Sequence, residues 1–269
     1  MWGCGDFGGG LLTRRTPLFG VVLGSQLVGM AMALVLALVR GESAMLPADV
    51  VWSLLAGVAG GIGITGLYNG LAVGRMGVVA PITAVIAALI PVAAGVVLQG
   101  VPPPLVLVGI GLAIVAVLLV SRVADDRDEL DRPSGFRFAI VGGLGIGAFS
   151  VFVAQISDGH AFGPLTLIRG MEAALIVGVV LVTRSAWRPE RRLLPAIAGV
   201  GVLDMAGNGA FILAVQAGSL AVAAVLSSLY PVTTVILAAV FLRERVTVTH
   251  AIGILLAVVA IACIAAGTT

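Results

Sequence analysis

Long apolar segments dominate this sequence and decide what it can fold into. Nine of them follow one another, each roughly 18–24 residues long: 18–39, 50–73, 78–98, 104–121, 136–156, 163–183, 193–216, 219–242 and 246–266. A helix needs about 20 predominantly apolar residues to cross the hydrocarbon core of a bilayer. The pattern therefore predicts nine membrane-spanning helices. The short breaks, marked by Gly, Pro or charge, favour antiparallel neighbours in one bundle.

The composition excludes a soluble domain. Hydrophobic residues make up 60% of the chain and charged residues 10%, whereas soluble domains carry about 25% charged residues. Such a chain cannot cover its apolar surface with polar groups, so it lies in lipid. The net charge of +2 gives no reason to expect a nucleic-acid partner.

Two stretches interrupt the apolar pattern. Residues 1–12 are apolar and glycine-rich but too short to cross a bilayer, and they lack the basic start of a signal peptide. We interpret them as the second half of a first helix that begins before this sequence. Residues 123–135 belong to the longest polar run and predict a linker.

An internal duplication organises the chain. Residues 71–73 match residues 213–215 at a separation of 142, and further matches downstream keep separations of 140 to 144. The duplication predicts two five-helix repeats, 1–122 and 136–269, joined by the linker at 123–135. Because five is an odd number, the two repeats have opposite orientations in the membrane, as in many secondary transporters.

Arginines fall unevenly on the two sides of the predicted bundle. Alternate connections, beginning after the first short segment, contain 13 arginines, and the other set holds only Arg40 and Arg169. Basic residues are enriched in cytoplasmic connections. The split therefore places the arginine-rich side in the cytoplasm and the C-terminus outside.

Several short motifs follow one another in order along the chain. They are Trp2–Gly3 with Asp6–Phe7, the stretch 71–81 (LAVGRMGVVAP), the stretch 227–231 (SSLYP) and the stretch 243–245 (RER). Their order, spacing and duplication resemble those of the EamA-like transporters of the drug/metabolite transporter superfamily. The resemblance covers essentially the whole chain. It implies ten helices, as two inverted five-helix repeats, around a central substrate cavity. Residues 99–101 (QGV) stand where the family has Gly-Glu-Arg in the first repeat.

Polar residues inside apolar segments are the candidate site residues, because burying such groups in a membrane is costly and usually serves function. Asp204 and Asn208 lie one helical turn apart and so share a face. This pair suits a cationic or hydroxyl-rich substrate, or a proton. The alternative is that Asp204 bonds to backbone at a kink among neighbouring glycines. We expect Asp204 to face a wet central cavity, with Tyr68 or Gln26 opposite.

Further candidates lie on other helices. Arg169 and Glu172, three residues apart, form either a substrate clamp or a structural ion pair near the membrane interface. The remaining candidates share a polar side chain within or beside an apolar segment: Gln26, Tyr68, Asn69, Asp6, Ser228 and Tyr230. For Gln26, a hydrogen bond between helices is the alternative. Asp6 is a natural proton site. The glycines of residues 57–66 predict close helix packing.

No motif points to an enzyme, a metal site or a cofactor. Cys4 and Cys263 are lone thiols near opposite ends of the chain, and the two histidines are far apart. The chain has no Lys, so it lacks a phosphate-binding loop of the Gly-rich Lys-Ser/Thr type. His160 and Asp158 lie in a short turn, where we expect them to be solvated.

These features predict a secondary transporter in the bacterial cytoplasmic membrane. We expect it to move a small metabolite or drug-like solute by alternating access, through proton-coupled efflux or exchange. A membrane channel or a lipid scramblase without gradient coupling is the alternative. The expected partners are the solute, lipid and protons, and the expected state is a monomer or a weak homodimer.

Overall fold

The computed structural model describes residues 1–99, 101, 103–120, 135–157, 159–216, 230–242 and 248–267. In chain order, its elements are α1 (Trp2–Thr13), α2 (Leu18–Arg40), α3 (Pro47–Val73), α4 (Met76–Gln99), α5 (Pro104–Val120), α7 (Phe136–Val153), α8 (Phe162–Thr183), the 3-10 turn η1 (Arg191–Leu193), α9 (Leu194–Gln216), α11 (Tyr230–Leu242) and α12 (Val248–Gly267). The described residues contain no strand, so the expected all-helical class is confirmed.

The helix boundaries follow the apolar segments of the sequence. Each predicted segment between residues 18 and 216 coincides with a helix to within three residues. The segment 219–242 is described only from Tyr230 onward. Five helical stretches are long and apolar enough to cross a membrane: Leu18–Arg40, Pro47–Val73, Phe136–Val153, Phe162–Thr183 and Arg191–Leu213. The chain is therefore a multi-pass membrane protein.

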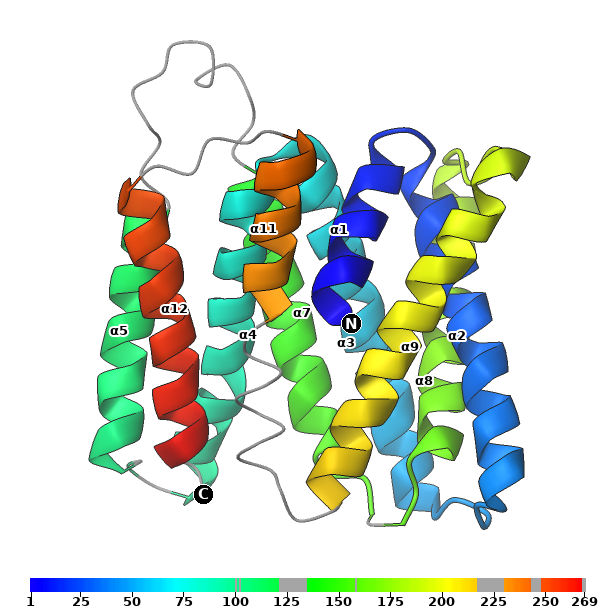
Figure 1. Ribbon diagram of the computed structural model, residues 1–269. Helices are drawn as coiled ribbons and strands as arrows, with labels where there is room; N and C mark the ends of the chain where they lie inside the picture. The colour runs from blue at the N-terminus through cyan, green and yellow to red at the C-terminus, as the bar shows by residue number, and fades with distance from the viewer. Residues whose placement is uncertain are drawn as a thin grey trace.

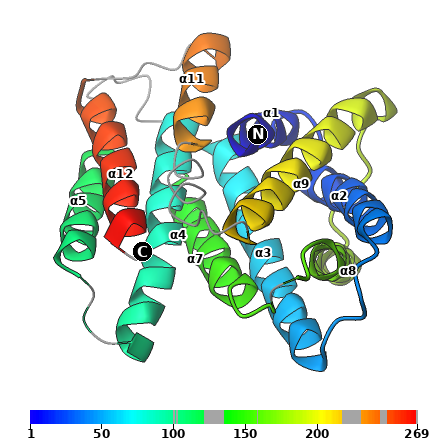
Figure 2. The same ribbon diagram turned by 60° about the horizontal axis from the view of Figure 1, so that its bottom comes forward.

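The helices stand side by side in one bundle (Figures 1 and 2). Helices α5 and α12 pair at one edge, α2, α8 and α9 lie toward the opposite edge, and α4, α7 and α11 lie between them. Helix α3 packs against α7 and α8, and α1 packs against both α3 and α9. The short helix α1 thus lies between elements from both halves of the chain.

Helices α3 and α7 approach each other closely because both present glycines. A Cβ atom on Gly63 would lie 2.7 Å from the Ile146 nitrogen, and one on Gly145 would lie 2.5 Å from the Gly63 Cα. Both distances are too short for real atoms, so a side chain at either position would push the helices apart. Gly66 is equally tight against α7, and Gly57 and Gly60 are tight against α8. The prediction that most glycines of residues 57–66 are packing positions is confirmed, Gly61 being the one with ordinary contacts only.

Two apolar clusters fill the bundle around α2, α8 and α9. The larger one includes Val22 of α2 and Val200 of α9, and the second includes Ala33 and Met205 of the same two helices. Residues that lie between these positions in sequence are therefore held between two apolar layers. Gln26 of α2 and Asp204 of α9 fall in this interval.

Connections gather at two opposite ends of the bundle. The α1–α2 and α8–α9 connections lie at the upper end in Figure 1, whereas the α2–α3 and α7–α8 connections lie at the lower end with the C-terminus. At the upper end the first turn of α2 touches the α8–α9 connection, since a Cβ atom on Gly20 would overlap the Trp187 carbonyl oxygen. The arginines of residues 14–15 and 184–192 therefore share one end of the molecule.

Candidate functional site

A buried charge cluster joins α2, α8 and α9. At its centre is Arg169 of α8, whose side chain is 5% exposed. Its Nη1 donates hydrogen bonds to Gln26 Oε1 at 2.6 Å and to Glu172 Oε2 at 2.9 Å. Its Nη2 donates to Asp204 Oδ2 at 2.5 Å. One guanidinium thus bridges two carboxylates and an amide contributed by three helices.

Asp204 is the acidic member of the cluster that solvent reaches. Its side chain is 20% exposed, compared with 3% for Glu172. Asn208 donates its Nδ2 to the Asp204 carbonyl oxygen at 2.9 Å and to Asp204 Oδ1 at 3.4 Å. The prediction that Asp204 and Asn208 share a face is therefore confirmed. Gln26 faces the bundle interior as expected, being only 2% exposed.

The ion pair expected between Arg169 and Glu172 is confirmed, with 2.9 Å between Nη1 and Oε2. The sequence did not reveal that Arg169 also pairs with Asp204, which lies 35 positions after it in the chain. Arg169 is seven residues past the first residue of α8, about 10 Å along the helix axis. The pair is therefore part of a network inside the bundle. Asp204 forms an ion pair with Arg169 and is not a residue that bonds to backbone at a kink.

Glycines on neighbouring helices make room for the cluster. A Cβ atom on Gly60 of α3 would overlap Glu172 Oε1. On α2, a Cβ atom on Gly29 would lie 3.6 Å from Arg169 Nε. The glycine-rich sequence of α3 thus allows close packing and also provides the space that the Glu172 carboxylate occupies.

Helix α1 brings Asp6 to the same region. Asp6 is 7% exposed, and its charge lies close enough to Asp204 for the two carboxylates to repel each other when both are ionised. Nearby, a Cβ atom on Gly5 would lie 3.8 Å from the Asp204 nitrogen. Tyr68 of α3 is 1% exposed, and its ring lies directly against Gly9, where a Cβ atom would overlap it. Five helices therefore contribute residues to this region.

The remaining sequence candidates lie apart from the cluster or outside the described residues. Asn69 is half-buried on α3, and among the described residues no hydrogen bond ties it to Arg169 or Asp204. Ser228 lies outside the described residues, as does Asp158, and Tyr230 begins α11 without a described side chain. Within the described ranges, no three His, Cys, Asp or Glu side chains are grouped so as to hold a metal ion.

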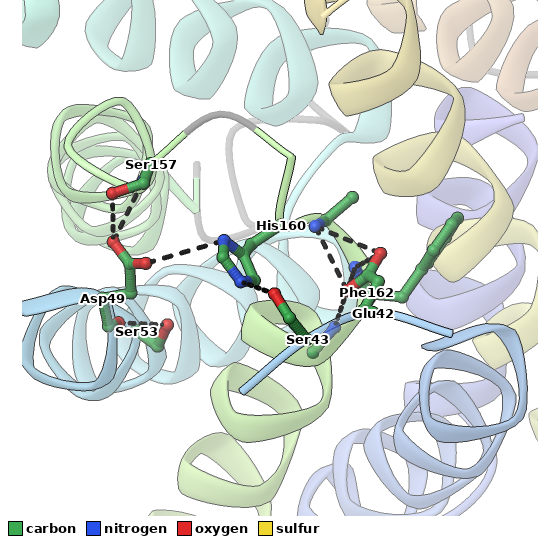
Figure 3. A network of polar contacts seen from close by, with 9 residues as sticks. Glu42, Ser43, Asp49, Ser53, Ser157, His160 and Phe162 are labelled. Atoms are coloured by element: carbon green, nitrogen blue, oxygen red, sulfur yellow. Dashed lines mark hydrogen bonds and ion pairs between the residues drawn. The ribbon is translucent and has the colours of Figure 1, made fainter. Parts of the chain in front are cut away.

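A second polar network joins the α2–α3 and α7–α8 connections (Figure 3). Glu42 accepts hydrogen bonds of 2.7 to 3.3 Å from the backbone N–H groups of Ala161, Phe162 and Gly163. These groups begin α8, where free N–H donors and the helix dipole favour a negative charge. Glu42 therefore caps a helix of the second half from a connection of the first half.

Asp49 and His160 form the other part of this network. Asp49 Oδ1 accepts hydrogen bonds of 3.0 Å from both the backbone N–H and the hydroxyl of Ser157. His160 Nδ1 lies 3.9 Å from Asp49 Oδ2, and its Nε2 shares a 3.1 Å hydrogen bond with Ser43. The expectation that His160 is solvated is wrong, because its side chain is 13% exposed and lies between these two partners.

An all-helical membrane bundle with a charge cluster buried between its helices is typical of membrane transport proteins. Residues 133–266, about half of the chain, match the model of the EamA-like transporter family. The chain belongs to this family, which is part of the drug/metabolite transporter superfamily. The resemblance inferred from the sequence motifs is confirmed, and the family consists of transporters rather than enzymes.

Solved structures share the fold over nearly the whole chain. One crystal structure, described only as "Crystal structure of protein", matches with a TM-score of 0.65 and 17% sequence identity, covering 97% of this chain and 96% of the other. Fourteen chains of known structure match significantly. A search of curated proteins finds no significant match. At this identity the structural likeness concerns the fold alone.

Proposed function

We propose that this protein is a secondary transporter that moves a small metabolite or drug-like solute by alternating access, coupled to protons. The observation that carries the proposal is the buried cluster of Arg169, Glu172 and Asp204, with side chains 5%, 3% and 20% exposed. Charged groups at membrane depth are costly and usually mark a substrate or ion pathway. A purely structural bundle gains little from such a cluster, because an apolar core of similar volume is often as stable.

Asp204 is the member of the cluster that we assign to proton binding. It is the more exposed of the two carboxylates on Arg169, and it holds the guanidinium through a single hydrogen bond. A proton on Asp204 would cancel its charge and weaken its bond to Arg169 Nη2. Asn208 bonds to both the backbone and the side chain of Asp204. Protonation of Asp204 would therefore also affect the hydrogen bonds of Asn208, one turn further along α9.

The packing of the helices supports two inverted repeats, residues 1–122 and 136–269, joined at 123–135. If α1 to α4 correspond to α7, α8, α9 and α11, each contact between the halves has a counterpart. The α3–α7 contact corresponds to α9–α1, the α4–α7 contact to α11–α1, and the α3–α8 contact to α9–α2. Helices α2 and α8, α4 and α11, and α5 and α12 each pair with their own counterpart. These are the contacts that a two-fold relation between the halves requires. Halves that fail to superpose after inversion would contradict the proposal.

The network of Glu42, Asp49 and His160 is the contact that we propose holds one end of the bundle closed. Its hydrogen bonds run from the α2–α3 connection and the first turn of α3, in the first half, to the α7–α8 connection and the first turn of α8, in the second half. Alternating access requires contacts between the halves that form at one end and break when that end opens. Helix caps and hydrogen bonds at a water-exposed end are suited to this because water can replace them.

The arginine distribution supports the proposed orientation. The arginines of residues 14–15 and 184–192 share one end of the bundle (Figure 1), and we assign this end to the cytoplasm of a bacterial cell. The end that carries the Glu42 network and the C-terminus then faces outward. With this orientation, export of a solute against incoming protons is the direction that we propose.

A transport screen in proteoliposomes, with and without a pH gradient, tests the proposed function. We expect saturable uptake of at least one solute that rises when the gradient is applied and returns to the passive level when an ionophore collapses it. Discrete conductance steps in a planar bilayer would favour the channel alternative. Movement of labelled lipid between leaflets without any gradient dependence would favour the scramblase.

A further inference from the structure

Asp49 places a buried carboxylate in the contact between the two halves of the chain. Its side chain is 1% exposed, and its Oδ1 accepts both hydrogen bonds from Ser157. Among the described residues, its Oδ2 has no hydrogen-bond partner. The group that faces this oxygen is the ring of His160, whose Nδ1 lies 3.9 Å away (Figure 3). This distance is too long for a hydrogen bond, and a buried oxygen without a donor is unfavourable.

The imidazole of His160 is placed to supply this donor when it is protonated. Its Nε2 lies 3.1 Å from Ser43 Oγ, so each ring nitrogen faces a polar partner. A neutral imidazole has one N–H donor, whereas the imidazolium has two. The imidazolium can therefore donate to Ser43 and to Asp49 at once, and its bond to Asp49 joins opposite charges. Such charge-assisted bonds are roughly twice as strong as neutral ones.

The other charged groups at this end of the bundle have partners of their own. Glu42 accepts hydrogen bonds from the N–H groups that begin α8. The guanidinium of Arg40 lies over the ring of Phe162, 5.5 Å from its centroid. The parts of α7 and α8 that adjoin their connection, residues 146–153 and 162–168, contain no charged residue. The response of this contact to pH therefore depends on the imidazole and on the carboxylate that faces it.

The position of the ring connects a proton from solvent to the contact between the halves. The side chain of His160 is 13% exposed, so solvent reaches it, whereas Asp49 is shielded. His160 belongs to the α7–α8 connection of the second half, whereas Ser43 and Asp49 belong to the α2–α3 connection and the first turn of α3, in the first half. A proton on the ring therefore strengthens bonds between the halves and not within one of them.

We propose that His160 is a second proton-binding site, and that its protonation holds closed the end of the bundle that carries the Glu42 network. This inference rests on the proposed closing role of that network and adds its control by pH. Histidine is the side chain that ordinarily changes charge between pH 5 and 8. In acid, the imidazolium bonds to Asp49 and stabilises the closed end. As the pH rises, the ring loses its charge and this stabilisation is lost. Asp204 belongs to the separate cluster on Arg169, so the two proton sites can be tested one at a time.

Hydrogen–deuterium exchange of backbone N–H groups reports on this contact directly. The N–H groups of Ser157 and of the first turn of α8 donate to carboxylates of the other half, so they are protected while this end is closed. Protection, the ratio of the intrinsic to the observed exchange rate at the same pH, is measured in detergent for residues 157–163 at pH 5 and pH 8. The measurement needs neither a solute nor a gradient, so it does not depend on the transport function.

We expect protection in the wild type to be about fivefold or more higher at pH 5 than at pH 8, the factor that a charged donor adds to a hydrogen bond. His160→Gln keeps a polar side chain that does not titrate in this range and should abolish the difference. Asp49→Asn should abolish it as well, and it carries the same test if His160→Gln does not fold. His250→Gln, at the only other histidine, should keep the difference.

Asp204→Asn should also keep the difference in protection, although we expect it to lose gradient-driven accumulation. Wild-type protection that does not rise at pH 5 would overturn the proposal, as would a rise that survives His160→Gln or Asp49→Asn. The expected rise in a protein that transports no solute would support the proton site at His160 and contradict the transport function alone.

Discussion

Replacing Arg169 with Met removes the cation of the charge cluster while filling much of its volume. The buried Glu172 carboxylate, 3% exposed, and Asp204 then lose their partner, and the Gln26 amide loses its donor. Removing one partner of a buried ion pair costs about 3–5 kcal/mol, because the remaining charge stays buried and unpaired. We therefore expect the free energy of unfolding of Arg169→Met to fall by about 3–5 kcal/mol.

Arg192→Met is the matched control. Arg192 Nε lies 2.5 Å from Glu190 Oε2, the same distance that separates Arg169 from Asp204, but its side chain is 80% exposed and that of Glu190 is 51% exposed. Exposed ion pairs contribute about 1 kcal/mol or less. Unfolding of both variants in detergent, followed by circular dichroism, should therefore separate them by about 3 kcal/mol.

A double variant tests the reason for the loss. Arg169→Met combined with Glu172→Met removes the cation together with its most buried partner, and apolar replacement of a whole buried ion pair is often neutral. The double variant should therefore recover most of the stability that Arg169→Met loses. If Arg169→Met is no less stable than Arg192→Met, or if the double variant is less stable than the single one, the cluster is not a balanced ion network.

Three further changes test the surroundings of the cluster. Gly60→Ala places a methyl group on the Glu172 carboxylate and should lower the melting temperature, whereas Gly178→Ala, with open space around its Cβ position, should leave it unchanged or raise it; equal melting temperatures would contradict the packing. Glu42→Gln keeps the side-chain shape but removes the charge at the start of α8, and should cost about 1 kcal/mol in thermal unfolding; no loss would argue against the cap. A C-terminal reporter that works only outside the cytoplasm should be active, and activity of a cytoplasm-only reporter instead would reverse the orientation.

The helices could be predicted from the sequence because the signals are local. The length of each apolar segment, together with Pro and Gly at its ends, sets where a helix begins and stops. Pro47 starts α3, and Gly41, with φ of 62°, follows the end of α2. The shared face of Asp204 and Asn208 was equally predictable, since the spacing within one helix determines it.

The bonds between helices could not be predicted in this way. Whether Arg169 meets Asp204 depends on the rotation and depth of α8 relative to α9, and the sequence of either helix leaves both open. His160 was misjudged for the same reason. Its turn looks solvated by itself, but Asp49, which lies 3.9 Å away, comes from α3. Only an indirect signal for this contact was present in the sequence. Glu42 and Asp49 lie at the connection between α2 and α3, and the order of the helices places this connection at the same end of the bundle as the connection at residues 157–161.

The most direct test of the account is gradient-driven transport by Asp204→Asn. The change keeps the size of the side chain but removes the charge that we assign to proton binding. Wild-type and variant protein, purified and shown to melt alike, are compared in proteoliposomes for accumulation driven by a pH gradient and for exchange of labelled for unlabelled solute. The account predicts that accumulation falls to the passive level in the variant, while exchange between the two sides persists. Accumulation equal to that of the wild type would contradict it and make Asp204 a structural residue.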